Sequence, residues 1–290
     1  MKSAAFDYVK AGSVAEAIAR LTADPFGTKL IAGGQSLLPA LNLRLSAPSL
    51  LVDIGQLPEL AGITVTGRIL RIGAGCTHAK LLTAPDIAGY APLIAEALAH
   101  VAHPAIRSRG TLGGSLANAD PAAELPAVML ALDATMIVEG ALGTRLIGAC
   151  DFFTGMFETA LAPDEILVAV DIPIRERRWG FAELARRHGD YAIIGLAATI
   201  TRAETRLAFF AAGPTALLAH RAAAALGTLP LDAERIGAAC RALAEDLPAH
   251  DDPEAGAAMR LHLAQVLLRR VATAWMTPGA TAGTEAGTDA

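Results

Sequence analysis

Two pairs of adjacent glycines constrain this chain more than any other feature of its sequence. They lie in residues 32–36 (AGGQS) and 110–115 (GTLGGS), each just after a well-patterned segment. Glycine tolerates positive φ and lets a ligand approach the backbone, so we expect both properties at Gly34 and Gly114, with N–H groups turned toward an anion. Two such loops suit a pyrophosphate and predict a dinucleotide cofactor. A tight turn is the alternative for either loop alone.

Neither loop matches the common nucleotide fingerprints. A P-loop requires lysine after its last glycine, where this chain has Gln35 and Ser115. The G-x-G-x-x-G fingerprint is approached only at 73–75 (GAG), and His78 stands where its third glycine would fall. These departures argue against a P-loop and against the usual Rossmann site.

Composition narrows the class of protein. The 290 residues suffice for two or three subdomains with cores, and the net charge of -5 argues against a nucleic-acid partner. The apolar runs are too short for a membrane span, and no signal peptide is expected at the N-terminus. Cys76, Cys150 and Cys240 are scattered, which indicates reduced thiols and a cytoplasmic location, and they are too few for an iron–sulfur cluster.

The order of local patterns predicts an α+β fold, because helices and strands are interspersed with hairpins rather than repeated as βαβ units. Ser13 followed by Glu16 indicates a capped helix start, and Gly67-Arg68 indicates a β-hairpin. A long loop is expected over 103–121. The expected helices are 14–21, 78–82, 92–102, 124–132, 216–226, 232–246 and 256–275. The expected strands are 29–32, 50–54, 63–66, 69–72, 135–139, 166–172, 181–185, 191–201 and 206–211.

Residues 101–126 (VAHPAIRSRGTLGGSLANADPAAELP) closely resemble the FAD-binding segment of the flavoprotein, or medium, subunits of molybdenum hydroxylases. That family includes aerobic carbon monoxide dehydrogenase and bacterial xanthine dehydrogenase. Residues 32–39 and 42–45 look like the first FAD loop of the family, and 186–193 (RRHGDYAI) looks like its later flavin-contact segment. The resemblance runs from about residue 1 to about residue 275.

The resemblance implies a particular domain organisation. Residues 1–173 would form a FAD-binding domain of the vanillyl-alcohol-oxidase (PCMH) type, built from two α+β subdomains at about 1–55 and 56–173. Residues 174–278 would form a small C-terminal α+β domain, an antiparallel sheet with helices. The Gly-, Ala- and Thr-rich stretch 279–290 is expected to be a disordered tail.

The resemblance also implies non-covalent FAD between the two N-terminal subdomains, with its pyrophosphate on the glycine loops. Glu124 stands where the family usually has Asp and would contact a hydroxyl of FAD. Leu167 would offer a backbone contact, and Tyr191 would lie near the isoalloxazine. A solvated lysine and a core tyrosine are the alternatives for Lys29 and Tyr191. The candidate cofactor-binding residues are Lys29, Ala32, Gly33, Gly34, Gln35, Ser36, Ala102, Thr111, Leu112, Gly113, Gly114, Ser115, Glu124, Leu167 and Tyr191.

Other side chains near these loops have competing interpretations. Arg107 and Arg109 could neutralise phosphate, but fixing the loop through carboxylates or carbonyls is favoured. His78 and His103 could tether a flavin covalently, and a structural role is favoured for His103 because it precedes a proline in a loop. Asp120 could be a helix N-cap or a ligand. The sequence predicts neither a catalytic residue nor a metal site on this chain.

The function implied by the resemblance is electron relay. Substrate would be oxidised on a large molybdenum-binding subunit, and iron–sulfur clusters on a small subunit would carry electrons to this FAD and on to NAD+ or a quinone. The molybdenum cofactor and the clusters are expected only on those partners, which could also place the chain at the inner face of a membrane. One alternative is a self-sufficient FAD-dependent oxidoreductase with its own substrate pocket. The other is a nucleotide-binding or structural module without redox work.

Overall fold

The computed structural model describes residues 2–187, 189–248 and 251–277, so the tail expected at 279–290 lies outside the described residues. The backbone divides into two compact units. The N-terminal unit comprises Met1–Tyr90, His103–Ala119 and Ala134–Ile174. The C-terminal unit comprises Ala91–Ala102, Asp120–Asp133 and Arg175–Ala290. The units therefore do not follow chain order, because two short segments from the first half of the sequence belong to the second unit.

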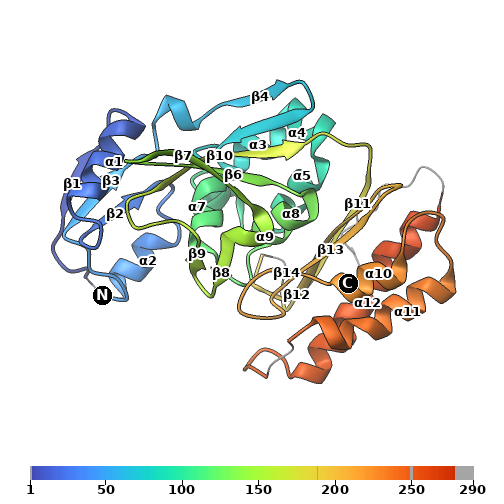
Figure 1. Ribbon diagram of the computed structural model, residues 1–290. Coiled ribbons are helices and arrows are strands. Elements are labelled where there is room, and N and C mark those ends of the chain that lie inside the picture. The colour runs from blue at the N-terminus through green and yellow to red at the C-terminus, as the bar shows by residue number, and fades with distance from the viewer. Residues whose placement is uncertain (1, 188, 249–250, 278–290) are drawn as a thin grey trace. The chain divides into compact units, whose positions relative to one another are not determined.

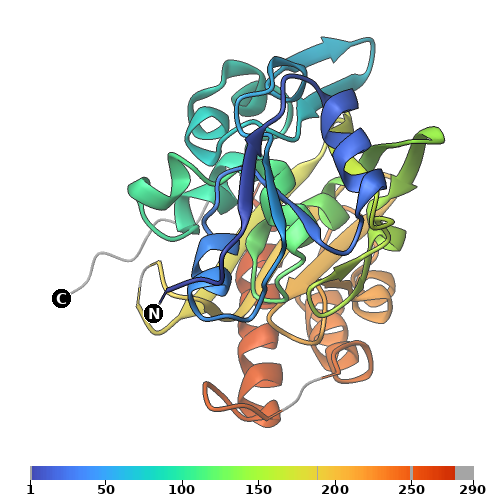
Figure 2. The same cartoon turned by 90° about the vertical axis from the view of Figure 1, so that its left-hand side faces the viewer.

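The N-terminal unit begins with a three-stranded parallel sheet in the order β1-β3-β2 (Figures 1 and 2). Its strands are β1 Asp7–Lys10, β2 Thr28–Ile31 and β3 Leu50–Asp53. Helix α1 (Val14–Ala23) connects β1 to β2, and the Ser13 hydroxyl accepts a hydrogen bond from the Glu16 N–H at 3.1 Å, so the predicted cap is confirmed. β1 was not predicted, because three of its four residues are exposed and show no apolar alternation.

A five-stranded antiparallel sheet completes the N-terminal unit, in the order β4-β5-β10-β6-β7 (Figure 1). Its strands are β4 Ile63–Thr66, β5 Ile69–Gly73, β6 Thr135–Gly140, β7 Gly143–Gly148 and β10 Ile166–Pro173. The predicted hairpin at Gly67-Arg68 joins β4 to β5. One core joins the two sheets, since Val52 of β3 and Ile137 of β6 belong to the same buried cluster.

Short elements surround these sheets in the N-terminal unit. They are α2 Leu37–Asn42, η1 Pro58–Leu60, α3 His78–Thr83, α4 Pro85–Tyr90, α6 Pro104–Arg107, α7 Leu112–Asn118, α9 Ala149–Phe152, β8 Phe153–Gly155 and β9 Glu158–Thr159.

The expected long loop over 103–121 is wrong, because the segment contains α6 and α7. The second glycine pair lies inside the first turn of α7. Thr111 is the N-cap of α7, and its hydroxyl accepts a hydrogen bond from the Gly114 N–H at 3.0 Å. Two glycines lower the intrinsic helix propensity of this stretch, so packing rather than local preference makes it helical.

The C-terminal unit is built on a second antiparallel sheet, in the order β11-β12-β13-β14. Its strands are β11 Arg178–Ala185, β12 Ala192–Ile200, β13 Thr205–Phe210 and β14 Leu217–Leu218. The predicted helices cover one face as α10 His220–Leu226, α11 Ala233–Asp246 and α12 Ala257–Met276 (Figure 1). Alternate strand residues such as Ile194, Leu196 and Phe209 share a buried core with Trp275 of α12. The prediction of an α+β fold is confirmed.

Helices α5 (Pro92–His100) and α8 (Glu124–Leu132) belong to this unit and pack against β11, β12 and β13. Residues 125–132 of α8 are all buried, so the helix shows no polar face in its sequence. Both faces of the central strand are covered as a result, and eight of the nine residues of β12, all but Ile193, are buried. The local pattern predicts α8 as a helix but not the sheet on which it packs.

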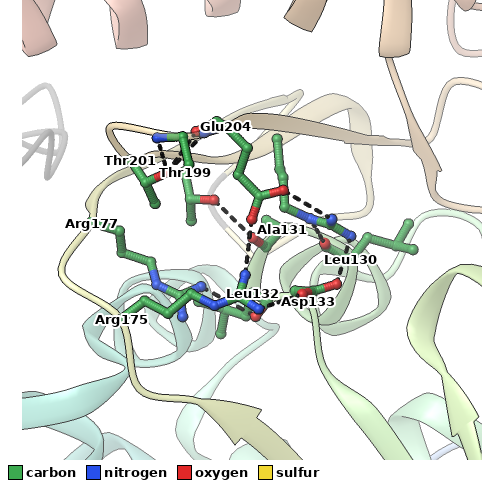
Figure 3. A network of polar contacts seen from close by, with 11 residues as sticks. Leu130, Ala131, Leu132, Asp133, Arg175, Arg177, Thr199, Thr201 and Glu204 are labelled. Atoms are coloured by element: carbon green, nitrogen blue, oxygen red, sulfur yellow. Dashed lines mark hydrogen bonds and ion pairs between the residues drawn. The ribbon is translucent and has the colours of Figure 1, made fainter. Parts of the chain in front are cut away.

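The C-terminal end of α8 is held by side chains from β12, from β13 and from the residue that precedes β11 (Figure 3). The carbonyl of Leu130 accepts from Arg206 Nε at 2.9 Å, and that of Leu132 accepts from Arg177 Nη1 at 3.2 Å. Between them, the carbonyl of Ala131 accepts from the Thr199 hydroxyl at 2.8 Å. Carbonyls in the last turn of a helix lack the usual donor four residues on. The Asp133 N–H donates to the Leu130 carbonyl at 3.3 Å, and the three side chains add donors to this and the two following carbonyls.

Two carboxylates complete the network drawn in Figure 3. Arg175 donates to Asp133 at 3.0 Å and to Glu204 at 2.9 Å, and Arg206 lies 3.3 Å from Asp133. Burial lowers the pKa of Arg177 to about 10, with the positive charge of Arg175 acting in the same direction. Arg177 is therefore charged at neutral pH. Its positive charge lies at the C-terminal, negative end of the α8 dipole, where a cation is stabilising.

Thr199→Val is expected to destabilise the C-terminal unit by about 1–3 kcal/mol, because it leaves the buried Ala131 carbonyl without its donor at nearly constant side-chain volume. Both tryptophans of the chain, Trp179 and Trp275, lie in this unit, so urea unfolding followed by tryptophan fluorescence reports on it. Thr273→Val, at an exposed position of α12 in the same unit, is the matched control, with an expected change within about 0.5 kcal/mol. Equal midpoints for the two variants would contradict the capping role.

Candidate functional site

The first glycine pair lies in the turn between β2 and α2, and its backbone donors are open. The N–H groups of Gly33, Gly34, Gln35 and Ser36 donate no hydrogen bond within the described part of the chain. The Gln35 side chain closes the turn by donating to the Gly33 carbonyl at 2.9 Å. Gly34 has φ of 74°, a conformation that L side chains rarely adopt. Consecutive open N–H groups in such a turn form an anion-binding concavity.

The second glycine pair has a different character. The N–H of Gly113 donates to the Ala74 carbonyl at 2.8 Å, and that of Gly114 donates to the Thr111 hydroxyl. The N–H groups of Leu112 and Ser115 are also used, by the carbonyls of Cys76 and Thr111. Gly34 is the only member of the two pairs with positive φ, so the expectation of positive φ at Gly114 is wrong. A helical backbone explains the difference.

Packing explains why Gly113 and Gly114 have no side chains. A Cβ atom on Gly113 would lie 2.5 Å from the Ala74 Cβ and 2.9 Å from the Ala74 carbonyl oxygen. A Cβ atom on Gly114 would lie 2.8 Å from the Thr111 hydroxyl oxygen that caps the helix. The pair therefore lets α7 begin directly against the segment that follows β5.

The two glycine segments meet backbone to backbone within the N-terminal unit. A Cβ atom on Gly33 would lie 2.1 Å from the Arg109 carbonyl oxygen and 3.0 Å from the Gly110 Cα. Real Cβ atoms do not approach backbone this closely, so Gly33 is required for the contact. The structure thus brings 32–36 together with the segment that leads into 111–115, as a pyrophosphate site requires.

The other candidates of the N-terminal unit lie in less distinctive surroundings. Lys29 is exposed on β2, and its side-chain ammonium has no hydrogen-bond partner among the described residues. The Leu167 side chain is 5% exposed on β10, beside a register irregularity between Leu167 and Ala169. Arg109 contributes its backbone carbonyl to the contact with Gly33, while its side chain is exposed.

The covalent-tether alternative is disfavoured for His78. Its side chain is 5% exposed, and Nε2 lies 3.1 Å from the Thr111 carbonyl oxygen. Burial lowers the pKa of His78 to about 4, and the charge of Arg107 acts in the same direction. His103 is exposed at the N-cap position of α6, where its side chain makes no cap hydrogen bond.

Three candidates, Ala102, Glu124 and Tyr191, belong to the C-terminal unit. Ala102 has φ of 43°, and a Cβ atom on Gly189 would lie 2.9 Å from its carbonyl oxygen. Tyr191 is 76% exposed, so the alternative of a buried core tyrosine is wrong. Asp120 accepts a hydrogen bond from the Ala122 N–H at 2.9 Å, whereas the N-cap of α8 is Ala123, so Asp120 caps a turn rather than the helix.

Carboxyl groups gather around the start of α8. Burial raises the pKa of Glu124 to about 8, and the charges of Glu183 and Asp120 raise it further. Glu124 is therefore neutral at pH 7 and can donate a hydrogen bond as well as accept one. Partial desolvation, with the charges of Asp120 and Glu124, also raises the pKa of Tyr191.

Sequence reasoning missed Glu183 and His100, which complete this cluster. The Glu183 side chain on β11 is 5% exposed, and its Oε1 lies 3.3 Å from His100 Nδ1. Its Oε2 is buried, and no described group donates a hydrogen bond to it. A lone glutamate within the apolar strand segment 181–185 (FAELA) was the available signal. An ionisable residue there must be partnered or functional.

Glu124→Gln is expected to stabilise the apoprotein increasingly as pH rises. The folded state keeps the Glu124 proton up to about pH 8, while the unfolded chain loses it near the ordinary value of 4.5, so wild-type stability falls across this interval. The amide cannot ionise, so the melting temperature of the variant minus that of the wild type should rise from pH 5 to pH 8.5. Glu176→Gln, at an exposed position, is the control. A difference that does not change with pH would contradict burial of a neutral Glu124.

Within the described ranges, no group of three or more His, Cys, Asp or Glu side chains is placed to hold a metal ion. No helix found there has the length and apolar character needed to cross a membrane. The three cysteines are free thiols, with Cys76 and Cys240 buried and Cys150 exposed.

Two family models match nearly the whole chain. The family described as the FAD binding domain in molybdopterin dehydrogenase matches residues 4–175. The family described as the CO dehydrogenase flavoprotein C-terminal domain matches residues 179–275.

Individual relatives and solved structures agree with these two family matches. The chain is 40% identical over 275 residues to the nicotine 6-hydroxylase medium subunit of Paenarthrobacter nicotinovorans, covering 93% of this chain and 97% of that subunit. It resembles the structure of quinoline 2-oxidoreductase from Pseudomonas putida 86 with a TM-score of 0.89 and 41% identity, over 94% of this chain and 97% of that one. Carbon monoxide dehydrogenase from Hydrogenophaga pseudoflava, in a form that lacks the Mo-pyranopterin moiety, gives a TM-score of 0.90 at 34% identity, over 93% and 96%.

Proposed function

This chain belongs to the FAD-binding, or medium, subunits of molybdenum hydroxylases, the family of carbon monoxide dehydrogenase and xanthine dehydrogenase, and from this premise we propose that it binds FAD and relays electrons. It is an oxidoreductase subunit. Substrate is oxidised on a large molybdenum-binding partner, and iron–sulfur clusters of a small partner deliver the electrons. The FAD held by this chain passes them to NAD+ or a quinone. The scattered free thiols support a cytoplasmic location.

The observation that carries the proposal is the open turn at 33–36, packed through Gly33 onto the backbone of Arg109 and Gly110. Unpaired N–H groups that a turn directs to one place favour an anion such as a pyrophosphate. The second glycine segment would contribute mainly by shaping this turn, since most of its own N–H groups are already used. Its Ser115 hydroxyl has no partner among the described residues and remains available to a phosphate.

The residues of the C-terminal unit are proposed to contact other parts of the cofactor. Glu124 would exchange hydrogen bonds with a hydroxyl of FAD, and its neutral carboxyl fits that role because it can both donate and accept. The exposed Tyr191 would lie near the isoalloxazine. Bound FAD supplies the one- and two-electron chemistry, and the protein binds and orients it.

Gly33→Ala is expected to lower FAD affinity about tenfold or more, equivalent to about 1.4 kcal/mol, because the new methyl group must push the first turn off the Arg109 carbonyl. Flavin fluorescence titration of the apoprotein measures the affinity, and circular dichroism checks the fold. Gly62→Ala is the control, because no atom lies within 4 Å of its Cβ position. Wild-type affinity in a folded Gly33→Ala protein would refute the assignment of the turn.

The isolated, FAD-loaded chain is expected to leave its flavin oxidised when candidate substrates such as an aldehyde, a purine or carbon monoxide are added anaerobically. Electrons must come from partner subunits in this proposal, so bleaching should appear once both partners are added. Absorbance of the flavin follows the reaction. Reduction of the flavin by substrate in the isolated chain would instead favour the self-sufficient oxidoreductase.

A further inference from the structure

We propose that His78 is a positioning residue for the pyrophosphate site: its imidazole N–H holds the Thr111 carbonyl and so fixes the backbone on which the first glycine turn rests. The inference rests on the proposed function, because it assigns a role to a residue that would not touch FAD. His78 is one of the few buried polar side chains of the described structure.

The contacts of His78 place it directly behind the second glycine segment. Thr77 and Thr111 form an antiparallel bridge, in which the His78 N–H donates to the Gly110 carbonyl and the Leu112 N–H donates to the Cys76 carbonyl, both at 2.9 Å. The side chain adds a third bond, between Nε2 and the Thr111 carbonyl at 3.1 Å.

The partner of Nε2 determines which nitrogen carries the proton. A carbonyl oxygen can only accept, so Nε2 must donate and the neutral ring carries its hydrogen there. Nδ1 is then a bare acceptor, buried without a donor among the described residues. The low pKa of about 4 agrees with a ring that stays neutral at physiological pH. A neutral ring adds no charge that would hold a phosphate directly, so its effect is on geometry.

The hydrogen bond between His78 and the Thr111 carbonyl holds both the start of α7 and the backbone at Gly110. The Thr111 carbonyl also accepts from the Ser115 N–H at 3.0 Å, in the first turn of α7, so His78 fixes the start of that helix. The ring also lies against Gly110, whose Cβ position is 3.2 Å from His78 Cε1 and Nδ1. The Gly110 Cα is in turn 3.0 Å from the Cβ position of Gly33. Close contacts therefore run from His78 through Gly110 to Gly33 at the open turn.

Three substitutions separate the hydrogen bond from simple packing. The Gln amide nitrogen reaches about as far as His Nε2, so His78→Gln should keep FAD affinity within about threefold of the wild type. The Asn amide ends near the Nδ1 position and cannot reach Thr111, so His78→Asn should weaken affinity about tenfold, the effect expected for one lost hydrogen bond. His78→Leu should weaken it similarly. Leu21→Ala, in the core at α1, controls for loss of affinity through general destabilisation.

The affinities are measured by flavin titration of the full-length apoproteins, with thermal unfolding as a parallel measurement. The ¹⁵N spectrum of the wild-type protein adds a direct readout: the His78 signals, assigned by their absence in His78→Gln, should show a protonated Nε2 and an unprotonated Nδ1 at pH 7. Equal affinities for wild type, His78→Asn and His78→Leu would overturn the inference. So would a Gln variant as weak as the Asn variant, or a proton found on Nδ1. Failure of the wild-type chain to bind FAD would instead refute the proposed function.

Discussion

The N-terminal unit depends on one close contact, the packing of Gly33 against the backbone of Arg109 and Gly110. A Cβ atom cannot fit there, so the contact exists only because both surfaces are bare backbone. It holds the turn after β2 in a shape that leaves four consecutive N–H groups without acceptors among the described residues. Neighbouring backbone donors in one turn are an arrangement that suits an anionic ligand, which is why the proposal places the pyrophosphate there.

The C-terminal unit depends on a different feature, the burial of helix α8 against its sheet. At the C-terminal end of this buried helix, the side chains of Thr199, Arg177 and Arg206 donate to the carbonyls of the last three residues. With that end fixed, the first turn of α8 presents Glu124 beside Glu183 and Asp120. Burying several carboxyl groups together is unfavourable when all of them are charged, and a protonated Glu124 lowers that cost. The start of α8 therefore holds a neutral hydrogen-bond donor, which a family-typical sequence pattern alone would not suggest.

The candidate residues differ in how well sequence reasoning could identify them. For the first turn, the expected positive φ is confirmed at Gly34, because adjacent glycines between a strand and a helix marked a region of unusual backbone. The second pair was found for a reason that does not apply, because its glycines are helical and serve close packing against Ala74. Glu183 and His100 were missed because no local pattern connects residues that are 83 positions apart and meet only through the sheet.

The sequence by itself determined local elements: the Ser13 cap and the hairpin at Gly67-Arg68 are each encoded within a few residues. It also determined the family, through motifs that can be read without coordinates. The tertiary structure alone decided that 112–118 is helical, that α5 and α8 join the C-terminal sheet, and that His78 is buried behind Gly110. The reason is physical: periodicity reports which face of an element is buried, but only long-range packing decides what covers it.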